Sequence, residues 1–311
     1  MSEIKKFLKL SKSVGEDFNL IQGPGGNTSY KKRDLIYIKK SGTFLRESEN
    51  VDIFISENVH KLEEFYNLSD NYEKFNKEMS IETPLHLIFK EKYVFHYHSL
   101  LSIIISTKYK LDFIKKFCFE NNISWIPYKR PGVDLSREVL KNIVEDKVKI
   151  YFLQNHGMLI ASNSLSEIDN TIKSTEALFK NKLQIEGSLR FDMLHLINSN
   201  NKLFEYSFKK GFQFEDLERI NAKYFFPDHA VFGNKIFQKY TPQTNIKSDV
   251  VYYQNNKIFV ENPLTNSEIE VISSVLQINN FCENIENFID LDLANELLNS
   301  EDEILRINKS K

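Results

Sequence analysis

Apolar side chains recur along this chain with two different spacings. Residues 4–18 carry them every three or four positions, which predicts a short amphipathic helix. Dense apolar runs at 35–39, 93–98, 148–153 and 158–161 predict strands, and residues 166–184 predict a long helix capped by Ser164 or Ser166. Because strands alternate with helices, we expect a layered α/β or α+β core.

Polar and glycine-rich stretches separate these elements. We expect a loop at 22–30, a polar helix within 57–79, a helix from about Ser99, an extended segment at 122–132 and a helix at 135–145. Ser80 is a plausible N-cap for a helix that holds Pro84 in its first turn, where a missing N–H does little harm.

The character of the chain changes after about residue 190. Residues 204–226 are rich in aromatic side chains, 250–260 predict a hairpin that turns at Asn255-Asn256, and the remainder predicts helices. We therefore expect a main domain at 1–190 and a smaller accessory region at 191–311.

Composition narrows the class of protein. The chain has 311 residues, 41% of them hydrophobic, and its net charge of −2 gives no footprint for nucleic acid. Cys118 and Cys282 form no CxxC pair, which indicates a reducing compartment and disfavours a cysteine metal site. The N-terminus does not resemble a signal peptide, and the longest apolar runs, such as 100–105, are too short to span a bilayer. We expect a cytoplasmic protein without membrane or nucleic-acid partners.

Three histidines stand where a divalent ion would be bound. His96 and His98 are two apart on a predicted strand, so both rings point the same way, and His156 stands just before Gly157, after a second predicted strand. Three neutral imidazoles with an open fourth position are typical of a catalytic metal site. A lone histidine is usually a core or surface residue, but that interpretation is weaker for this pattern.

Glycines gather near the same segments. Of ten glycines in the chain, five are Gly23, Gly25, Gly26, Gly42 and Gly157. Glycine permits close backbone approach, so their clustering indicates tight loops around a ligand, although ordinary turn chemistry explains any single one.

Five motifs together resemble the class II aldolase/adducin family. They are Gly25-Gly26-Asn27-Thr28-Ser29, Lys40-Ser41-Gly42-Thr43, Ser80-Ile81-Glu82-Thr83-Pro84-Leu85-His86, His96-Tyr97-His98-Ser99 and Asn155-His156-Gly157, in the family's order. Within the family the chain is most similar to the aldolase half of bacterial rhamnulose-1-phosphate aldolase/alcohol dehydrogenase fusions, which also share Tyr128 to Gly132 and Pro227 to Phe232. No GxGxxG follows a strand in this sequence, so we expect no dehydrogenase half.

The resemblance implies a three-layer αβα sandwich with a central mixed, largely antiparallel sheet. It also implies a divalent metal, Zn²⁺ above others, on His96, His98 and His156, and a homotetramer with sites near subunit interfaces. The implied reaction is reversible cleavage of a C–C bond in a phosphorylated ketose, in which the ion stabilises an enediolate.

Further site residues follow from the same resemblance. Glu82 is the expected proton carrier, although as a first-turn acid it would also stabilise a helix dipole. The expected phosphate-binding residues are those with small donors near turns and helix starts: Asn27, Ser41, Gly42, Thr43 and Ser80. Each of them could instead serve as an ordinary cap or turn residue.

Some positions depart from the family pattern or gain no catalytic role. Ile81 replaces a serine that many aldolases carry, and Lys40 adds a charge beside Ser41. His86 is expected to be a packed or supporting residue, and Arg130 an ordinary surface arginine. Asp228 and His229 have no mechanistic role in this reading and are expected to form a structural turn.

Two other function classes stay open. The same metal site suits an epimerase acting on a pentulose phosphate or a dehydratase acting on a sugar phosphate, since the family contains both. A non-catalytic, adducin-like scaffold is the third possibility, although the three histidines and Glu82 argue against it.

Overall fold

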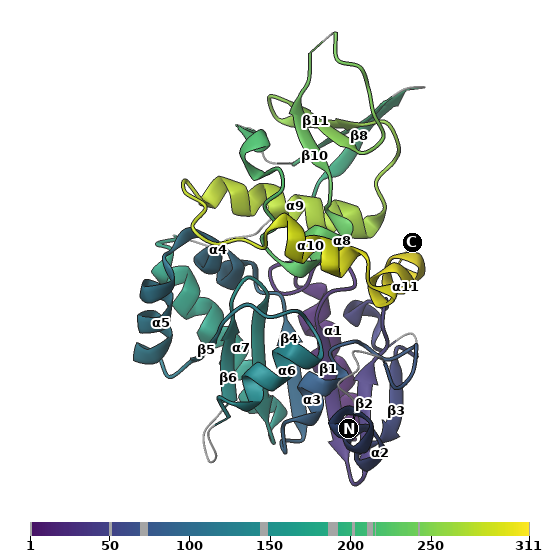
Figure 1. Cartoon of the computed structure of the whole chain (residues 1–311), viewed down its shortest axis with the longest axis vertical. Helices are drawn as coiled ribbons and strands as arrows, with labels where there is room; N and C mark the ends of the chain where they lie inside the picture. The colour runs from purple at the N-terminus through teal and green to yellow at the C-terminus, as the bar shows by residue number, and fades with distance from the viewer. Residues whose placement is uncertain are drawn as a thin grey trace.

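The computed structural model describes residues 2–49, 52–68, 74–143, 149–185, 192–200, 203–209, 214, 216–241 and 243–310. Two β-sheets and the helices around them make up the described part of the chain. Figure 1 shows the larger sheet in the lower half of the molecule and the smaller sheet at the top, with several helices between them. None of the described helices is long and apolar enough to cross a membrane.

The larger sheet has seven strands among the described residues, in the order β3-β2-β1-β4-β7-β6-β5. Their bounds are β1 Asn27–Lys32, β2 Leu35–Lys39, β3 Phe54–Asn58, β4 Tyr93–Tyr97, β5 Ser124–Ile126, β6 Lys149–Leu153 and β7 Gly157–Ser162. Neighbouring strands pair antiparallel except β5 and β6, which are parallel. The predicted mixed, largely antiparallel sheet is confirmed.

Helices cover both faces of this sheet. One face carries α1 (Glu3–Glu16), α4 (Leu100–Lys108), α5 (Leu111–Glu120) and α7 (Leu165–Lys182), and the other carries α2 (Val59–Leu68), α3 (Thr83–Leu87) and α6 (Val133–Leu140). Alternation along β4 explains this: Phe95 packs with the first group and Val94 with the second, and both are fully buried. The three-layer αβα sandwich is therefore confirmed.

The smaller sheet follows in the C-terminal third. Its strands are β8 (His195–Asn200), β9 (Leu203–Ser207), β10 (Ile236–Lys239), β11 (Val250–Gln254) and β12 (Lys257–Val260), in the order β10-β11-β12-β9-β8. The helices here are α8 (Pro227–Phe232), α9 (Asn266–Phe281), α10 (Leu291–Leu298) and α11 (Glu301–Lys309). Short 3₁₀ turns occupy Leu45–Glu47 and Leu217–Ile220.

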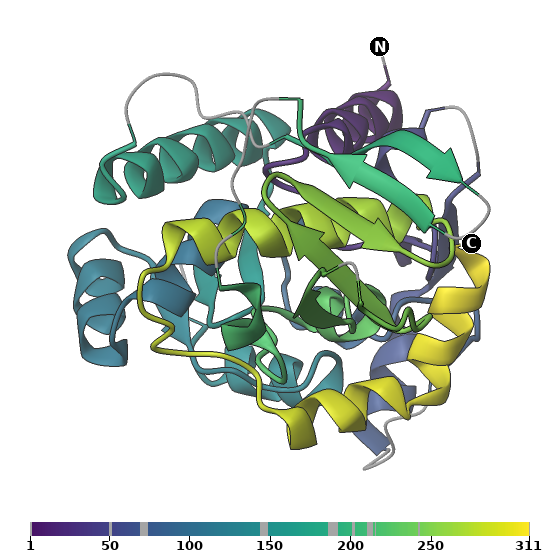
Figure 2. The same cartoon turned by 90° about the horizontal axis from the view of Figure 1, so that it is seen from above.

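Helix α9 joins the two parts. It begins at a capping box in which Thr265 and Glu268 satisfy each other's backbone N–H groups. Its side chains, among them Val271 and Val275, share one core with α1, α4, α5 and α7 on one face of the large sheet. Figure 2 shows α9 running beneath the small sheet. The predicted C-terminal α+β region and the hairpin at 250–260 are confirmed.

Some predicted boundaries were wrong. Residues 27–30 belong to β1 rather than to a loop, because all four pair with β4, and Ser29 and Tyr30 also pair with β2. Ser80 does not cap a helix: Glu82 holds the N-cap position of α3, and the Ser80 hydroxyl accepts the Glu82 N–H at 3.2 Å. Within 57–79 the helix spans only Val59–Leu68, and within 135–145 it begins at Val133 and ends at Leu140. Parts of those predictions, at 69–73, 144–145 and 148, lie outside the described residues.

Candidate active site

A three-residue turn places His156 beside the end of β4. Gln154-Asn155-His156 joins the antiparallel strands β6 and β7, and Asn155 adopts a left-handed φ of 49°. The Ser106 hydroxyl accepts the Asn155 N–H at 2.8 Å, and the Asn155 amide donates to the Phe225 carbonyl at 3.0 Å. The turn is thus fixed from both parts of the chain.

Gly157 allows the close approach that this turn needs. Its φ is +144°, and a Cβ there would lie 2.3 Å from the Tyr97 carbonyl oxygen. Only glycine fits such a position without moving one of the two strands. The absence of a side chain therefore lets β7 press against the end of β4, where His98 lies.

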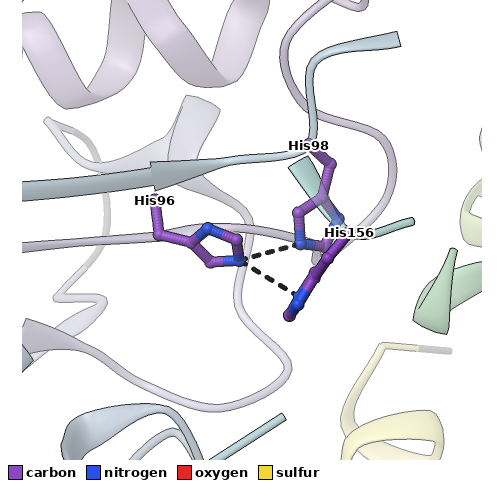
Figure 3. A group of neighbouring side chains, drawn as sticks. All are labelled: His96, His98 and His156. Atoms are coloured by element: carbon purple, nitrogen blue, oxygen red, sulfur yellow. Dashed lines mark hydrogen bonds between the residues drawn. The ribbon is translucent and has the colours of Figure 1, made fainter. Parts of the chain in front are cut away.

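The three histidines predicted from the sequence do come together. The His96 Nε2 lies 3.2 Å from the His98 Nε2 and 3.3 Å from the His156 Nε2, and Figure 3 shows the rings converging. One ligand atom from each residue falls within 4.8 Å of the others, and all three side chains are buried. Nitrogens held 2.0–2.1 Å from a tetrahedral ion are about 3.3 Å apart, so the spacing suits a metal such as zinc.

The hydrogen bonds around the rings also fit a cation. The His96 Nδ1 lies 2.9 Å from the Met158 carbonyl oxygen, and the His98 Nδ1 lies 3.0 Å from the Asp228 Oδ2. Both partners are acceptors, so we assign the ring protons to Nδ1, which leaves both Nε2 atoms as bare lone pairs. Two lone pairs that face each other at 3.2 Å in the interior repel unless a positive charge lies between them.

Burial keeps the histidines in the metal-binding form. Loss of water around the imidazole lowers the pKa of His96 below its usual value, and the same cause takes the pKa of His156 well below it. Both rings are therefore neutral at physiological pH, and protons do not compete strongly for their lone pairs. The cluster can hold a divalent metal ion.

Glu82 completes the cluster. Its Oε1 lies 3.3 Å from the His156 Nε2 and 3.5 Å from the His96 Nε2, and the residue is only 6% exposed. The other oxygen, Oε2, accepts a hydrogen bond from the Asn27 amide at 2.7 Å. Oε1 is buried without a hydrogen-bond donor, which is costly unless a cation or a substrate proton lies there. The carboxylate points at the histidines, and its side chain does not cap α3.

His86 supports Glu82 through Asn27. Its ring contacts the Ser29 hydroxyl at 2.8 Å and forms a short hydrogen bond with the Asn27 Oδ1. Burial lowers the pKa of His86 well below its usual value, so the ring is neutral and fixes the orientation of the Asn27 amide. It lies outside the metal cluster, in the supporting position that the sequence predicted.

Asp228 lies in the site, contrary to the expectation that it forms only a structural turn. It is fully buried at the start of α8, where its Oδ2 meets His98 and its Oδ1 lies 2.6 Å from an Arg306 guanidinium nitrogen. Burial alone would raise the pKa of this carboxyl, but the charge of Arg306 and the contacts with Arg306 and His98 outweigh it and hold the pKa well below its usual range. His229 does have the expected structural role, since its Nδ1 accepts the Phe225 N–H at 3.1 Å.

Arg306 reaches this cavity from α11. Its guanidinium also lies 3.1 Å from Glu303, and 15% of its side chain is exposed. Nothing in the local sequence distinguishes this arginine from those of any amphipathic surface helix, so sequence reasoning missed it. Asp228 did carry a signal, because an acidic residue beside Pro227 and several aromatic residues is unusual in a solvated turn.

Lys39 lies in the site, whereas the sequence analysis expected the charge of Lys40 there. Lys39, only 3% exposed, donates to the Pro24 carbonyl at 2.9 Å and the Thr43 carbonyl at 2.7 Å, and burial lowers its pKa to about 7. Lys40, which was expected to add charge here, instead lies about 4 Å from the acids Asp52 and Glu78. Lys39 is the last residue of β2, and Lys40 follows it in an isolated bridge to Met79, so the side chains of these extended neighbours face opposite ways.

The predicted phosphate-binding residues lie partly around the same cavity. Its wall in the described chain is formed by Pro24, Gly26, Asn27, Lys39, Ser41, Gly42, Ser80, Ile81, Glu82, His98, Pro131, His156, Pro227, Asp228, Asp302, Glu303 and Arg306. Thr43 does not belong to that wall, because its hydroxyl donates to the Lys40 carbonyl at 2.8 Å. The backbone N–H of Ser41 is also occupied, by the Glu78 carbonyl at 2.8 Å. Other donors at this wall include the hydroxyls of Ser41 and Ser80 and the charged groups.

A comparison of the whole sequence with models of known protein families gives a match that includes the histidine cluster. The model of the family described as Class II Aldolase and Adducin N-terminal domain matches residues 5–183, more than half of the chain and all three histidines. This chain therefore belongs to the class II aldolase/adducin family.

Individual relatives each match half of the chain or slightly more. L-fuculose phosphate aldolase of Methanocaldococcus jannaschii is 29% identical over 181 residues, which are 54% of this chain and 88% of that protein. The uncharacterized oxidoreductase YuxG of Bacillus subtilis is 23% identical over 180 residues, half of this chain but only 26% of its own length. The N-terminal class II aldolase domain of a conserved protein from Thermoplasma acidophilum superposes with a TM-score of 0.50 at 24% identity, over 58% of this chain and 94% of that one, and shares its fold.

Proposed function

We propose that this protein is a divalent-metal aldolase that cleaves or forms a C–C bond in a phosphorylated ketose. The observation that carries the proposal is the cluster of His96, His98 and His156 with an unpartnered Glu82 oxygen 3.3 and 3.5 Å from two of the ring nitrogens. The name of the Methanocaldococcus relative, an L-fuculose phosphate aldolase, supports the same chemistry.

We propose Zn²⁺ as the ion and the three Nε2 atoms as its ligands. Three histidines and one open position are the donor set of a catalytic zinc site. A zinc ion bound there would act as a Lewis acid on the substrate oxygens that gain negative charge as the C–C bond breaks.

Glu82 is proposed to move the proton. A general base must lie within hydrogen-bond range of the carbon that gains or loses a proton, and Oε1 points into the cavity while Oε2 stays bonded to Asn27. The Asn27 amide and, behind it, His86 hold the carboxylate in one orientation. These contacts let one oxygen react while the other is fixed.

The anionic end of the substrate is proposed to lie against Asn27, Ser41, Gly42, Thr43 and Ser80, as the family resemblance implies. In this chain Thr43 acts on the shape of the Ser41–Thr43 turn through Lys39 and Lys40 rather than as a direct donor. Lys39 and Arg306 add positive charge to the same cavity.

Substrate entry requires α11 to move outward. The cavity has a volume of about 30 Å³, roughly a tenth of the smallest typical ligand pockets and enough for an ion with one or two waters. The last turn of α11 lies directly over Gly42, since a Cβ there would be 2.8 Å from the Lys309 Cβ and 3.3 Å from the Arg306 carbonyl oxygen. Residues 191–311 are thus proposed to be an accessory region that closes the site of the 1–190 domain. As the resemblance implies, we also propose a cytoplasmic homotetramer.

Release of an aldehyde tests the proposal. Metal-stripped protein is loaded with Zn²⁺, incubated with L-fuculose 1-phosphate and other ketose 1-phosphates, and the aldehyde is trapped and quantified. We expect aldehyde from at least one substrate, and far slower release from Glu82→Gln. A loaded protein that releases no aldehyde from any of them would refute the aldolase proposal. An inverted or dehydrated sugar phosphate among the products would indicate an epimerase or dehydratase.

A further inference from the structure

A chain of charged contacts links the C-terminal helix to one of the three histidines. The Arg306 guanidinium lies 2.6 Å from the Asp228 Oδ1, and the Asp228 Oδ2 lies 3.0 Å from the His98 Nδ1. Each residue comes from a different element: α11, α8 and the end of β4. The family model ends at residue 183, so two of the three residues lie outside the matched segment.

The contact between Asp228 and His98 is buried within the protein. Asp228 is fully buried and His98 is 3% exposed. The backbone of Gly25 covers the contact so closely that a Cβ there would lie 2.4 Å from the Asp228 Oδ2 and 2.8 Å from the His98 Nδ1. A buried charge of this kind is costly unless it is paired, and here Oδ1 lies 2.6 Å from Arg306 and Oδ2 lies 3.0 Å from the His98 Nδ1.

Charged groups surround Asp228 in this cavity. Arg306 contacts it directly and lies 3.1 Å from Glu303, and Lys39 and Glu82 line the same wall. The geometry therefore presents one carboxylate oxygen of Asp228 to the Nδ1 of His98.

We propose that Asp228 is a positioning residue for His98, fixing its proton on Nδ1 and its Nε2 toward the metal, and that Arg306 holds Asp228 in place for this purpose. The inference rests on the metal site proposed above. A carboxylate on the outer nitrogen of a histidine ligand makes the ring a stronger donor and sets its orientation. Two residues of the accessory region would thus set the metal affinity of a site whose ligands all lie in the family domain.

Metal affinity and the visible spectrum test this without relying on turnover. The dissociation constant for Zn²⁺ is measured by competition with a chromophoric chelator, and the Co²⁺-substituted protein is recorded between 500 and 700 nm, roughly the range of tetrahedral cobalt bands. Removing such a carboxylate typically weakens metal binding about 10- to 100-fold. We expect that loss for Asp228→Asn, with a shifted cobalt spectrum, and a smaller loss for Arg306→Gln that Arg306→Lys partly restores.

Glu91→Gln is the matched control. Glu91 is a largely buried carboxylate, 2.7 Å from Lys149, at the end of the sheet away from the histidines. This variant loses a comparable ion pair, and we expect wild-type affinity and spectrum. Should Asp228→Asn fail to fold, Arg306→Gln and Arg306→Lys, which keep the carboxylate, decide the question.

The outcomes separate the two proposals. Folded Asp228→Asn and Arg306→Gln proteins with wild-type zinc affinity and an unchanged cobalt spectrum would overturn the positioning role and leave the metal site standing. Wild-type protein that binds neither zinc nor cobalt would instead overturn the proposed function. An equal loss of affinity in Glu91→Gln would also count against the inference, because it would mark a general loss of stability.

Discussion

Gly25→Ala is expected to weaken metal binding although residue 25 is not a ligand. The added methyl group would lie 2.4 Å from the Asp228 Oδ2, 2.8 Å from the His98 Nδ1 and 2.9 Å from the Gln22 carbonyl oxygen. Ordinary contact distances for carbon are about 3.5 Å, so the carboxylate or the ring must move by roughly one ångström. Either movement separates Asp228 from His98.

The expected size of the effect follows from the bond that breaks. A hydrogen bond to a charged group contributes about 1.5–3 kcal/mol, and its loss here would leave the Asp228 charge partly unpaired. Because about 1.4 kcal/mol corresponds to a factor of ten, zinc affinity should fall by roughly 10- to 100-fold. The protein should also lose about 1–3 kcal/mol of stability, as is usual for overpacked cores.

Gly23→Ala separates the local clash from a general effect of changing the loop. Gly23 has a φ of +57°, and its added Cβ would lie 3.6 Å from Ser267, an ordinary contact. The variant should lose about 1–2 kcal/mol of stability to left-handed strain and keep wild-type zinc affinity in chelator competition. Equal zinc affinities for Gly25→Ala and wild-type protein would refute the reasoning.

Three further predictions follow from the same structure. Glu82→Gln should lower kcat by about 10²- to 10⁴-fold while zinc still binds; unchanged kcat would exclude Glu82 as the proton carrier. The folded-state pKa of His229 is lowered to about 3 by burial, so its contribution to stability is complete above its unfolded pKa near 6.5 and is lost as pH falls from there toward 3. Urea unfolding of metal-free protein measures the free energy of unfolding at each pH. This free energy should change with pH about 1.4 kcal/mol per pH unit less steeply for His229→Gln than for wild type across that range, and an equal pH dependence of the two proteins would contradict the assignment. Burial raises the pKa of Cys118 and Cys282 to about 12, so both thiols should react with a disulfide reagent only on unfolding, and fast reaction of the native protein would contradict this.

The spacing of apolar side chains predicted most strands and helices of the family domain, because each of these elements buries one face, or both, in the core. The strand that ends in His96 and His98 is fully buried, and a period of two leaves only one way to direct the two rings. Local chemistry also predicted a helix from about Ser99 and named Ser164 as one of two candidate caps of the long helix, and both serines prove to be N-caps, where a hydroxyl satisfies a free N–H. The His96–His98–His156 cluster could be predicted from such short-range rules, because the turn between β6 and β7 brings His156 beside the end of β4.

The rest of the site depends on contacts that no short window of sequence contains. Arg306 meets Asp228 across 78 positions, and Asp228 meets His98 across 130. Ser80 was misjudged for a related reason, because its hydroxyl satisfies the Glu82 N–H without beginning the helix. The Thr43 hydroxyl donates to the Lys40 carbonyl within the turn, a contact that the motif alone does not reveal.

The metal content of the folded protein tests the central claim most directly. Protein stripped with a chelator, reloaded with excess Zn²⁺ and desalted should retain one ion per chain by mass spectrometry of the metal. The folded double variant His96→Ala/His156→Ala should retain almost none, because a single remaining imidazole is too weak a ligand. Wild-type protein that keeps far less than one ion per chain, or a double variant that keeps as much as wild type, would contradict the account.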